Sequence, residues 1–206
     1  MDDTYRTITA TSEGYLMEKR SKFYSFAFPI KDVEDAMNIV DEYRKKFYDA
    51  RHVCWAYMIG SDRLEFRSND DGEPSGTAGK PILGQINSFE LTDILVIVVR
   101  YFGGTLLGTG GLIKAYREAA ADAISNAEII EKTVDDVLKI HFDYTVLNDV
   151  MRVLKQFEEV QWTQDFKESC RMTLIVRQSQ TEALKGMLSG IYGVSFEGDE
   201  AFHKKD

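Results

Sequence analysis

The stretch that decides the fold is "VVRYFGGTLLGTGGLIKAYREAA", residues Val98–Ala120. A run of β-branched residues ends in an Arg-Tyr-Phe step, and five glycines follow within nine positions. A helical pattern of apolar residues then begins near Leu112. The stretch therefore predicts a buried strand that leads through a glycine-rich loop into a helix.

The glycine-rich loop does not match the two common phosphate-binding motifs. Gly103 and Gly108 have the spacing of GxxxxGK[ST], but Thr109 and Gly110 occupy the positions of the lysine and the Ser or Thr. The dinucleotide-binding fingerprint needs a third glycine where Ile113 stands. These mismatches argue against a P-loop nucleotidase and a dinucleotide-dependent enzyme.

An anion site at this loop is nevertheless a reasonable hypothesis. Glycines let a ligand approach the backbone closely, and a helix that begins near Leu112 directs unpaired N–H groups at it. We expect Lys114 in the first turn of this helix and Arg117 one turn later. The alternative is that the glycines only allow the strand and the helix to pack closely. The predicted anion-binding or nucleic-acid-binding set is Arg100, Tyr101, Gly103, Gly104, Thr105, Gly108, Thr109, Gly110, Gly111, Lys114, Arg117 and Lys80.

A second unusual segment is the acidic loop "DDGEPSGTAGKP", which begins at Asp70. Three carboxylates within four positions could hold Mg²⁺ or orient a water molecule, although such a turn can also be simply solvated. Lys80 could neutralise these carboxylates or join the anion site. We call this segment the motif loop, with candidate residues Asp70, Asp71, Gly72, Glu73, Pro74, Ser75, Gly76 and Thr77.

His52 and Cys54 share one face of a predicted strand and could form a nucleophilic pair. Side chains two residues apart on a strand usually stand too far apart for a direct hydrogen bond, and buried cysteines are mostly inert. No histidine or cysteine spacing matches a metal site, so the sequence predicts neither a metal nor a cofactor.

The composition indicates a cytoplasmic globular protein of 206 residues, 44% of them hydrophobic and 29% charged. The net charge of −9 argues against a surface that is basic throughout, so any anion site has to be local. The N-terminal stretch lacks the pattern of a secretory signal, and no apolar run is long enough for a membrane helix.

The fold class expected from these patterns is α+β with two domains. Residues 1–133 are predicted to form, in order along the chain, strands, a helix starting after Asp32, a hairpin, a short helix near Pro81, the buried strand and a helix over Leu112–Ala127. Residues 134–206 follow the order β-α-β-β-α-β of a ferredoxin-like domain.

The motifs "DDGEPSGTAGKPIL", "VIVVRYFGGTLLGTGGLIKAYREAA" and the upstream "ARHVCWAY" together resemble the signature of the YigZ/IMPACT family. The resemblance implies an N-terminal α/β sandwich like domain two of ribosomal protein S-five. It also implies a C-terminal domain similar to the last domain of elongation factor G. The family implies a role in translational control, and no settled catalytic activity comes with it.

Three hypotheses follow. The leading one is a translation-associated binding protein rather than an enzyme. Its expected partner is RNA, the ribosome or a translation-control protein, and no membrane association is expected. The second is a metal-dependent phosphohydrolase or nucleotidyl-type enzyme that uses Asp70, Asp71 and Glu73. The third is a pure protein-interaction module. The oligomeric state is left open.

Overall fold

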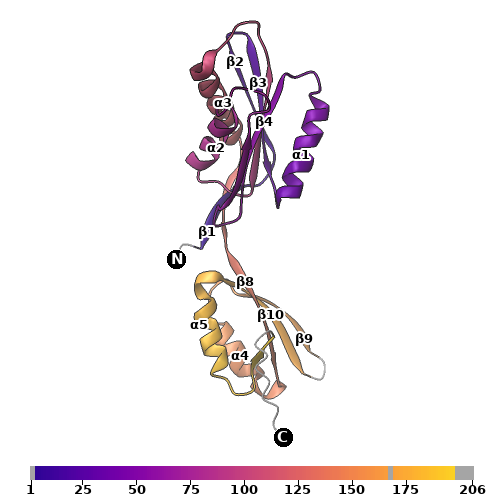
Figure 1. The fold of residues 1–206 in the computed structure, drawn as a ribbon. Coiled ribbons are helices and arrows are strands. Elements are labelled where there is room, and N and C mark those ends of the chain that lie inside the picture. The colour runs from indigo at the N-terminus through magenta and orange to yellow at the C-terminus, as the bar shows by residue number, and fades with distance from the viewer. Residues whose placement is uncertain (1–2, 167–168, 198–206) are drawn as a thin grey trace. The chain divides into compact units, whose positions relative to one another are not determined.

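The computed structural model describes residues 3–166 and 169–197, which fall into two compact units (Figure 1). One unit comprises Tyr5–Lys132, and the other comprises Thr133 onward together with the N-terminal residues up to Thr4. Within the described residues, none of the helices combines the length and the apolar character that crossing a membrane requires.

The first unit is built on a five-stranded antiparallel sheet that carries helices on both faces (Figure 1). Helices α2 and α3 pack on one face and α1 on the other. A separate two-stranded sheet pairs β1 with β7. In spatial order, the main sheet contains β2 (Ser12–Glu18), β3 (Ser21–Pro29), β6 (Ile94–Tyr101), β4 (His52–Ile59) and β5 (Glu65–Asn69). The remaining elements are α1 (Val33–Lys46), α2 (Gly79–Ser88), α3 (Gly108–Ser125), β1 (Thr4–Ile8) and β7 (Ile129–Thr133).

Strand β6 is the centre of this sheet, as its uniformly apolar sequence predicts. Val96 and Val98 belong to the core cluster beneath α2 and α3, whereas Leu95, Ile97 and Val99 belong to the cluster beneath α1. A strand that is covered on both faces needs an apolar side chain at every position rather than at alternate ones. The predicted hairpin and the Asp32 cap of α1, whose carboxylate accepts the N–H of Asp35, are confirmed as well.

The predicted start of the helix that follows the glycine loop is wrong by four residues. Helix α3 begins at Gly108 rather than at Leu112, so Gly110 and Gly111 lie inside it. Glycine is a poor helix former, and a propensity argument therefore assigns both residues to the loop. The helix extends through them because Leu107 and Leu112, which flank the glycines, are both buried in the core.

The second unit is a four-stranded sheet in the order β11-β8-β10-β9 with antiparallel neighbours. On β10, Cys170, Met172, Leu174 and Val176 are buried and the intervening residues face outward, as the spacing of these apolar residues at alternate positions of the sequence indicates. Their core partners come from β8 and the two helices. Along the chain the elements are β8 (Asp135–Phe142), a 3₁₀ turn (Tyr144–Val146), α4 (Leu147–Leu154), β9 (Gln161–Phe166), β10 (Cys170–Arg177), α5 (Gln178–Ser189) and β11 (Ser195–Phe196).

Asp3 attaches the N-terminal residues to the second unit. Its buried carboxylate accepts hydrogen bonds from the backbone N–H of Ser179 at 3.0 Å and from Arg177, whose Nη2 lies 2.9 Å away. Hydrogen bonds from Ser179, and then the guanidinium of Arg177, hold the pKa of Asp3 well below its ordinary value.

We expect Asp3→Asn to lower the free energy of unfolding at neutral pH and to have less effect in acid. The folded-state pKa lies below the value of about 3.9 in an unfolded chain, so the stabilisation is complete above that pH and is lost as the pH falls through the folded-state pKa. Urea unfolding from pH 7 to pH 3 measures this difference. Asp149→Asn, at an exposed ion pair with Arg152, is the control, and an Asp3→Asn effect that did not shrink in acid would contradict the prediction.

Candidate functional site

The glycine loop between β6 and α3 is shaped by close packing and by left-handed backbone. A Cβ atom at Gly103 would collide with the backbone of Arg20 and Ser21, and the Gly103 N–H donates to Ser21 Oγ at 3.2 Å. Gly104 and Gly108 have φ values of +85° and +71°, where other residues are strained. Gly103 is therefore required by its close approach to the β2–β3 turn rather than by packing of the strand on the helix, and this does not exclude a ligand at the helix start.

A cavity of about 360 Å³ opens beside this loop. It lies where the start of β4, the motif loop, the end of β6 and the start of α3 meet. Its polar lining includes Arg51, His52, Glu73, Arg100 and Thr109, whereas the apolar lining comes mainly from Phe102, Leu106, Leu107 and Leu112. Gly72, Pro74 and Gly108 complete the wall.

The floor of the cavity is a buried ion pair. Arg100 Nη1 lies 2.6 Å from Glu73 Oε1, and the two side chains are only 6% and 4% exposed. Tyr116 donates its hydroxyl to the same Glu73 oxygen at 2.8 Å. Burial raises the pKa of Tyr116 well above its ordinary value, so this phenol stays protonated and remains a donor.

The Arg100 guanidinium lies between two aromatic rings, with 5.6 Å to the centroid of Phe23 and 5.7 Å to that of Phe102. Its second terminal nitrogen lies 3.4 Å from Ser21 Oγ. The buried Nε has no hydrogen-bond partner among the described residues. This nitrogen is an unsatisfied donor in a residue that lines the cavity.

The carboxylates of the motif loop point to three different sets of partners. Asp70 accepts N–H groups from Gly76, Ala78 and Gly79, and in this way caps α2, whose own N-cap residue has no capping side chain. Burial acts to raise the pKa of Asp70, but the three N–H donors and Lys80 outweigh it and leave the pKa below its usual value.

Asp71 and Glu73 have their own partners. Asp71 accepts the N–H of Val53 at 2.7 Å and a hydrogen bond from Arg44 at 3.2 Å. Glu73 binds Arg100 and Tyr116 on the cavity floor. Across the part of the chain that the structure describes, no group of three or more acidic, His or Cys side chains has the arrangement of a metal site.

The side chains of His52 and Cys54 both connect β4 to the motif loop by hydrogen bonds. His52 Nδ1 lies 2.7 Å from the carbonyl oxygen of Asp71, and its Nε2 lies 3.8 Å from Glu73 Oε1. The Cys54 thiol is fully buried and donates to the carbonyl of Asp70 at 3.0 Å. Burial raises the pKa of Cys54 strongly, which keeps the thiol protonated and disfavours it as a nucleophile.

Of the predicted anion-site cations, Arg100 lines the cavity, whereas Lys114, Arg117 and Lys80 lie elsewhere. Because α3 begins at Gly108, Lys114 falls in its second turn, where it is exposed and lies 3.7 Å from Glu118. Arg117 and Lys80 line a separate groove between α2 and α3, together with Gly76. Tyr101 also lies away from the cavity and donates its hydroxyl to Asp49 at 2.8 Å.

The sequence analysis missed Arg51 and Phe102. The Arg51 guanidinium lies 5.6 Å from the centroid of the Phe102 ring, and the Arg51 N–H donates to the carbonyl of Arg100. Pairing of β4 with β6 places His52 opposite Arg100 and so brings Arg51 to the end of β6. The signal was the arginine at the start of "RHVCWAY", but the strand register was needed to interpret it.

We expect Gly103→Ala to lower the free energy of unfolding by about 1–3 kcal/mol because the β2–β3 turn must move to admit a methyl group. Gly110→Ala is the matched control, since a Cβ atom added at this helical residue would meet no neighbouring atom within 4 Å. That control should stabilise by up to about 1 kcal/mol. Urea denaturation compares the two, and equal effects would rule out the close approach as the reason for Gly103.

Comparisons with known proteins agree with this architecture. Residues 19–124 match the family model described as the Impact N-terminal domain. An IMPACT family member of Haemophilus influenzae is 34% identical over 83% of this chain and 84% of its own length. The IMPACT family member YigZ of Escherichia coli is 38% identical over 67% of this chain and 69% of its own.

A solved structure described as that of a hypothetical protein is also similar. It shares 28% identity with this chain and covers 95% of it, and the alignment spans 97% of the solved chain with a TM-score of 0.70. The family model includes both the motif loop and the glycine loop that enclose the cavity. By the family model and by relatives that span most of its length, the chain belongs to the IMPACT family.

Proposed function

We propose that this chain is a translation-associated binding protein that holds a phosphate of an RNA backbone at the N-terminus of α3. Membership of the IMPACT family is what supports the proposed role in translation. The phosphate site comes from the geometry of the cavity beside the glycine loop.

The observation that carries the phosphate site is the uncapped start of α3 beside two arginines. Leu107 occupies the N-cap position without a capping side chain, and the first turn contains no acidic residue. The N–H groups of the first helical residues, Gly108 to Gly110, therefore lack the usual partners, and the helix dipole favours an anion in front of them. Arg51 and Arg100 line the same cavity, and Arg100 Nε is an unsatisfied donor.

Binding is favoured over metal-dependent turnover because the motif-loop carboxylates have other roles. Asp70 caps α2, Asp71 binds Val53 and Arg44, and Glu73 neutralises Arg100. A phosphohydrolase that used these three carboxylates would have to break all of those contacts to gather them around one ion. A protein partner in place of RNA is an outcome that the salt-series experiment distinguishes.

We further propose that the two units correspond to the expected domains, with an IMPACT-type sandwich followed by a ferredoxin-like domain, in a cytoplasmic protein. The order β8-α4-β9-β10-α5-β11 supports the second assignment, and so does the sheet order, which places the first and third strands of the unit in the centre. Similarity of that domain to the last domain of elongation factor G, and a translation-control partner, belong to the same proposal.

We expect Arg51→Gln to weaken binding of an abasic oligonucleotide, which presents a phosphate backbone without bases. The loss of one phosphate contact should reduce the slope of log K against log[salt] by about 0.7. Fluorescence anisotropy of a labelled abasic oligomer over a salt series measures both quantities.

The matched control is the double variant Lys114→Gln/Arg117→Gln, which removes two cations outside the cavity and should leave the slope nearly unchanged. If the double variant lowered the slope and Arg51→Gln did not, the cavity would not be the phosphate site. Absence of nucleic-acid binding at every salt concentration would favour the protein-interaction module.

A further inference from the structure

A second hollow shares the lining residue Phe102 with the cavity, and its lining is unusual for an acidic protein. Its volume is about 410 Å³. The six lining residues are all aromatic or cationic, and we call them the aromatic–basic surface: Arg20, Lys22, Tyr24, Phe47, Tyr101 and Phe102. No carboxylate is among these described lining residues, although the chain carries a net charge of −9.

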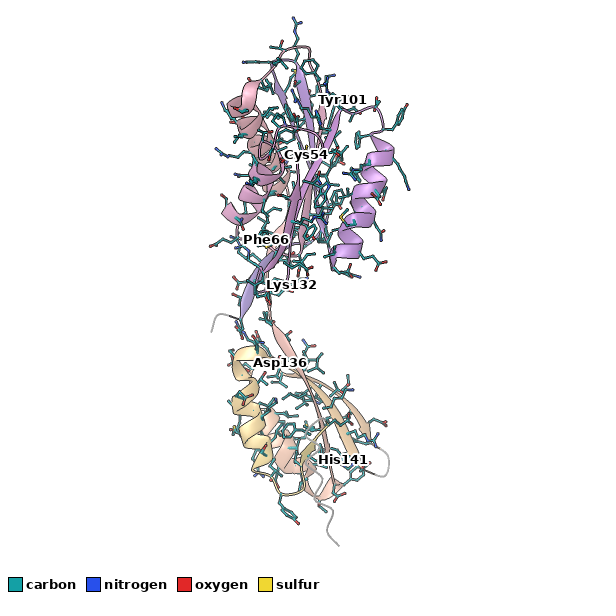
Figure 2. The ribbon with its side chains drawn as sticks, viewed as in Figure 1. Cys54, Phe66, Tyr101, Lys132, Asp136 and His141 are labelled. Atoms are coloured by element: carbon teal, nitrogen blue, oxygen red, sulfur yellow. The ribbon has the colours of Figure 1, made fainter. Side chains whose placement is uncertain are left out.

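Strand register builds this surface. Lys22 of β3 lies opposite Tyr101 of β6, and Tyr24 of β3 lies opposite Tyr15 of β2. Tyr24 and Tyr101 pack at the edge of the core beneath α1, and Figure 2 places Tyr101 near the end of the sheet on the side of that helix. Helix α1 ends at Lys46, so these side chains are only partly covered.

The aromatic rings form a row across three strands. The Tyr15 and Tyr24 centroids are 5.1 Å apart, and the Tyr24 and Tyr101 centroids are 6.0 Å apart with nearly perpendicular planes. Tyr15 is 46% exposed and Phe102 is 40% exposed. Tyr24 and Tyr101 are partly exposed. Aromatic rings that solvent reaches offer platforms on which unpaired bases can stack.

Cations accompany the rings. Arg20 and Lys22 are exposed, and Lys46 Nζ lies 4.8–5.9 Å from the centroids of Phe26, Tyr43 and Phe47. The nearby carboxylate of Asp49 accepts the Tyr101 hydroxyl. Burial and then this hydrogen bond raise the pKa of Tyr101 to about 12, so the ring remains neutral.

From this geometry we infer that the aromatic–basic surface binds single-stranded RNA, with bases stacked on the tyrosines and Phe102 and phosphates held by Arg20 and Lys22. A duplex is a poor fit because its bases are already stacked on one another, whereas a protein segment with an acidic surface would not need a row of rings. The inference rests on the proposed function and extends its site, since Phe102 lines both hollows.

The test compares a labelled RNA of about ten nucleotides, within the range of site sizes known for single-strand binders, with an abasic oligomer of the same length. Wild-type protein should bind the RNA more tightly, and the ratio of the two affinities reports base stacking alone. Tyr24→Leu and Phe102→Leu should each reduce this ratio about tenfold, because one stacked base contributes roughly 1–3 kcal/mol. Lys22→Gln should instead lower the salt slope by about 0.7 for both oligomers.

Control variants and measurements distinguish loss of base stacking from other effects of the substitutions. Tyr24→Phe and Tyr101→Phe retain the rings and should leave the ratio unchanged, and Tyr192→Leu removes a 97% exposed ring from the second unit. Thermal unfolding of each variant separates lost binding from lost folding. A deoxyribose oligomer distinguishes RNA from DNA, and equal affinity for the two would restrict the inference to single strands of either kind and overturn its RNA selectivity.

The outcomes separate this inference from the phosphate site. If the ratio is unaffected by Tyr24→Leu and Phe102→Leu while Arg51→Gln weakens both oligomers, the aromatic–basic surface only completes the core and the inference is wrong. If the ratio falls while Arg51→Gln has no effect, the surface binds RNA and the phosphate site is misplaced. If wild-type protein binds neither oligomer, both proposals fail.

Discussion

The buried ion pair between Arg100 and Glu73 is the interaction on which the rest of the first unit depends. Removing two charges from water costs several kcal/mol per ion, and a pair repays this only when its remaining hydrogen-bonding groups are satisfied. Here the helix α3 residue Tyr116 donates to the carboxylate, and the β3 residues Ser21 and Phe23 contact the guanidinium, whose Nε alone has no partner among the described residues. The pair thereby fixes the motif loop against β6, β3 and α3 at one point.

The position of this pair explains why the motif loop and the glycine loop are both needed. The motif loop positions Glu73 beside Arg100. Asp70 of the same loop caps α2, and Asp71 binds residues of β4 and α1. The glycine loop lets the chain turn directly after Arg100, with Gly103 pressed against the backbone of Ser21. A helix start without a cap of its own then faces the cavity whose floor is the ion pair.

An acidic protein can still present a local anion site because short-range groups dominate inside a cavity, whereas distant charges are screened by salt. Arg51 and Arg100 line one hollow, Arg20 and Lys22 line the other, and Phe102 lines both. The net charge of −9 disfavours non-specific attraction of nucleic acid, so the proposed binding depends on these few groups.

Elements with strong periodicity or a clear cap could be predicted from the sequence alone. The uninterrupted apolar run of β6, the alternation of β10 and the Asp32 cap depend on neighbouring residues, so they can be predicted locally. The motifs also determined the family and the two loops that surround the cavity.

Which side chains share a site depends on long-range packing. Lys114 and Arg117 are close to the glycine loop in sequence, yet the earlier start of α3 turns them away, and Arg51 arrives from a strand almost fifty residues upstream of Arg100. The helix start depends on burial of Leu107 and Leu112, and the arrival of Arg51 depends on the register of β4 against β6. Both are long-range packing effects, and no local pattern encodes them because the free energy that fixes them comes from contacts with distant parts of the chain.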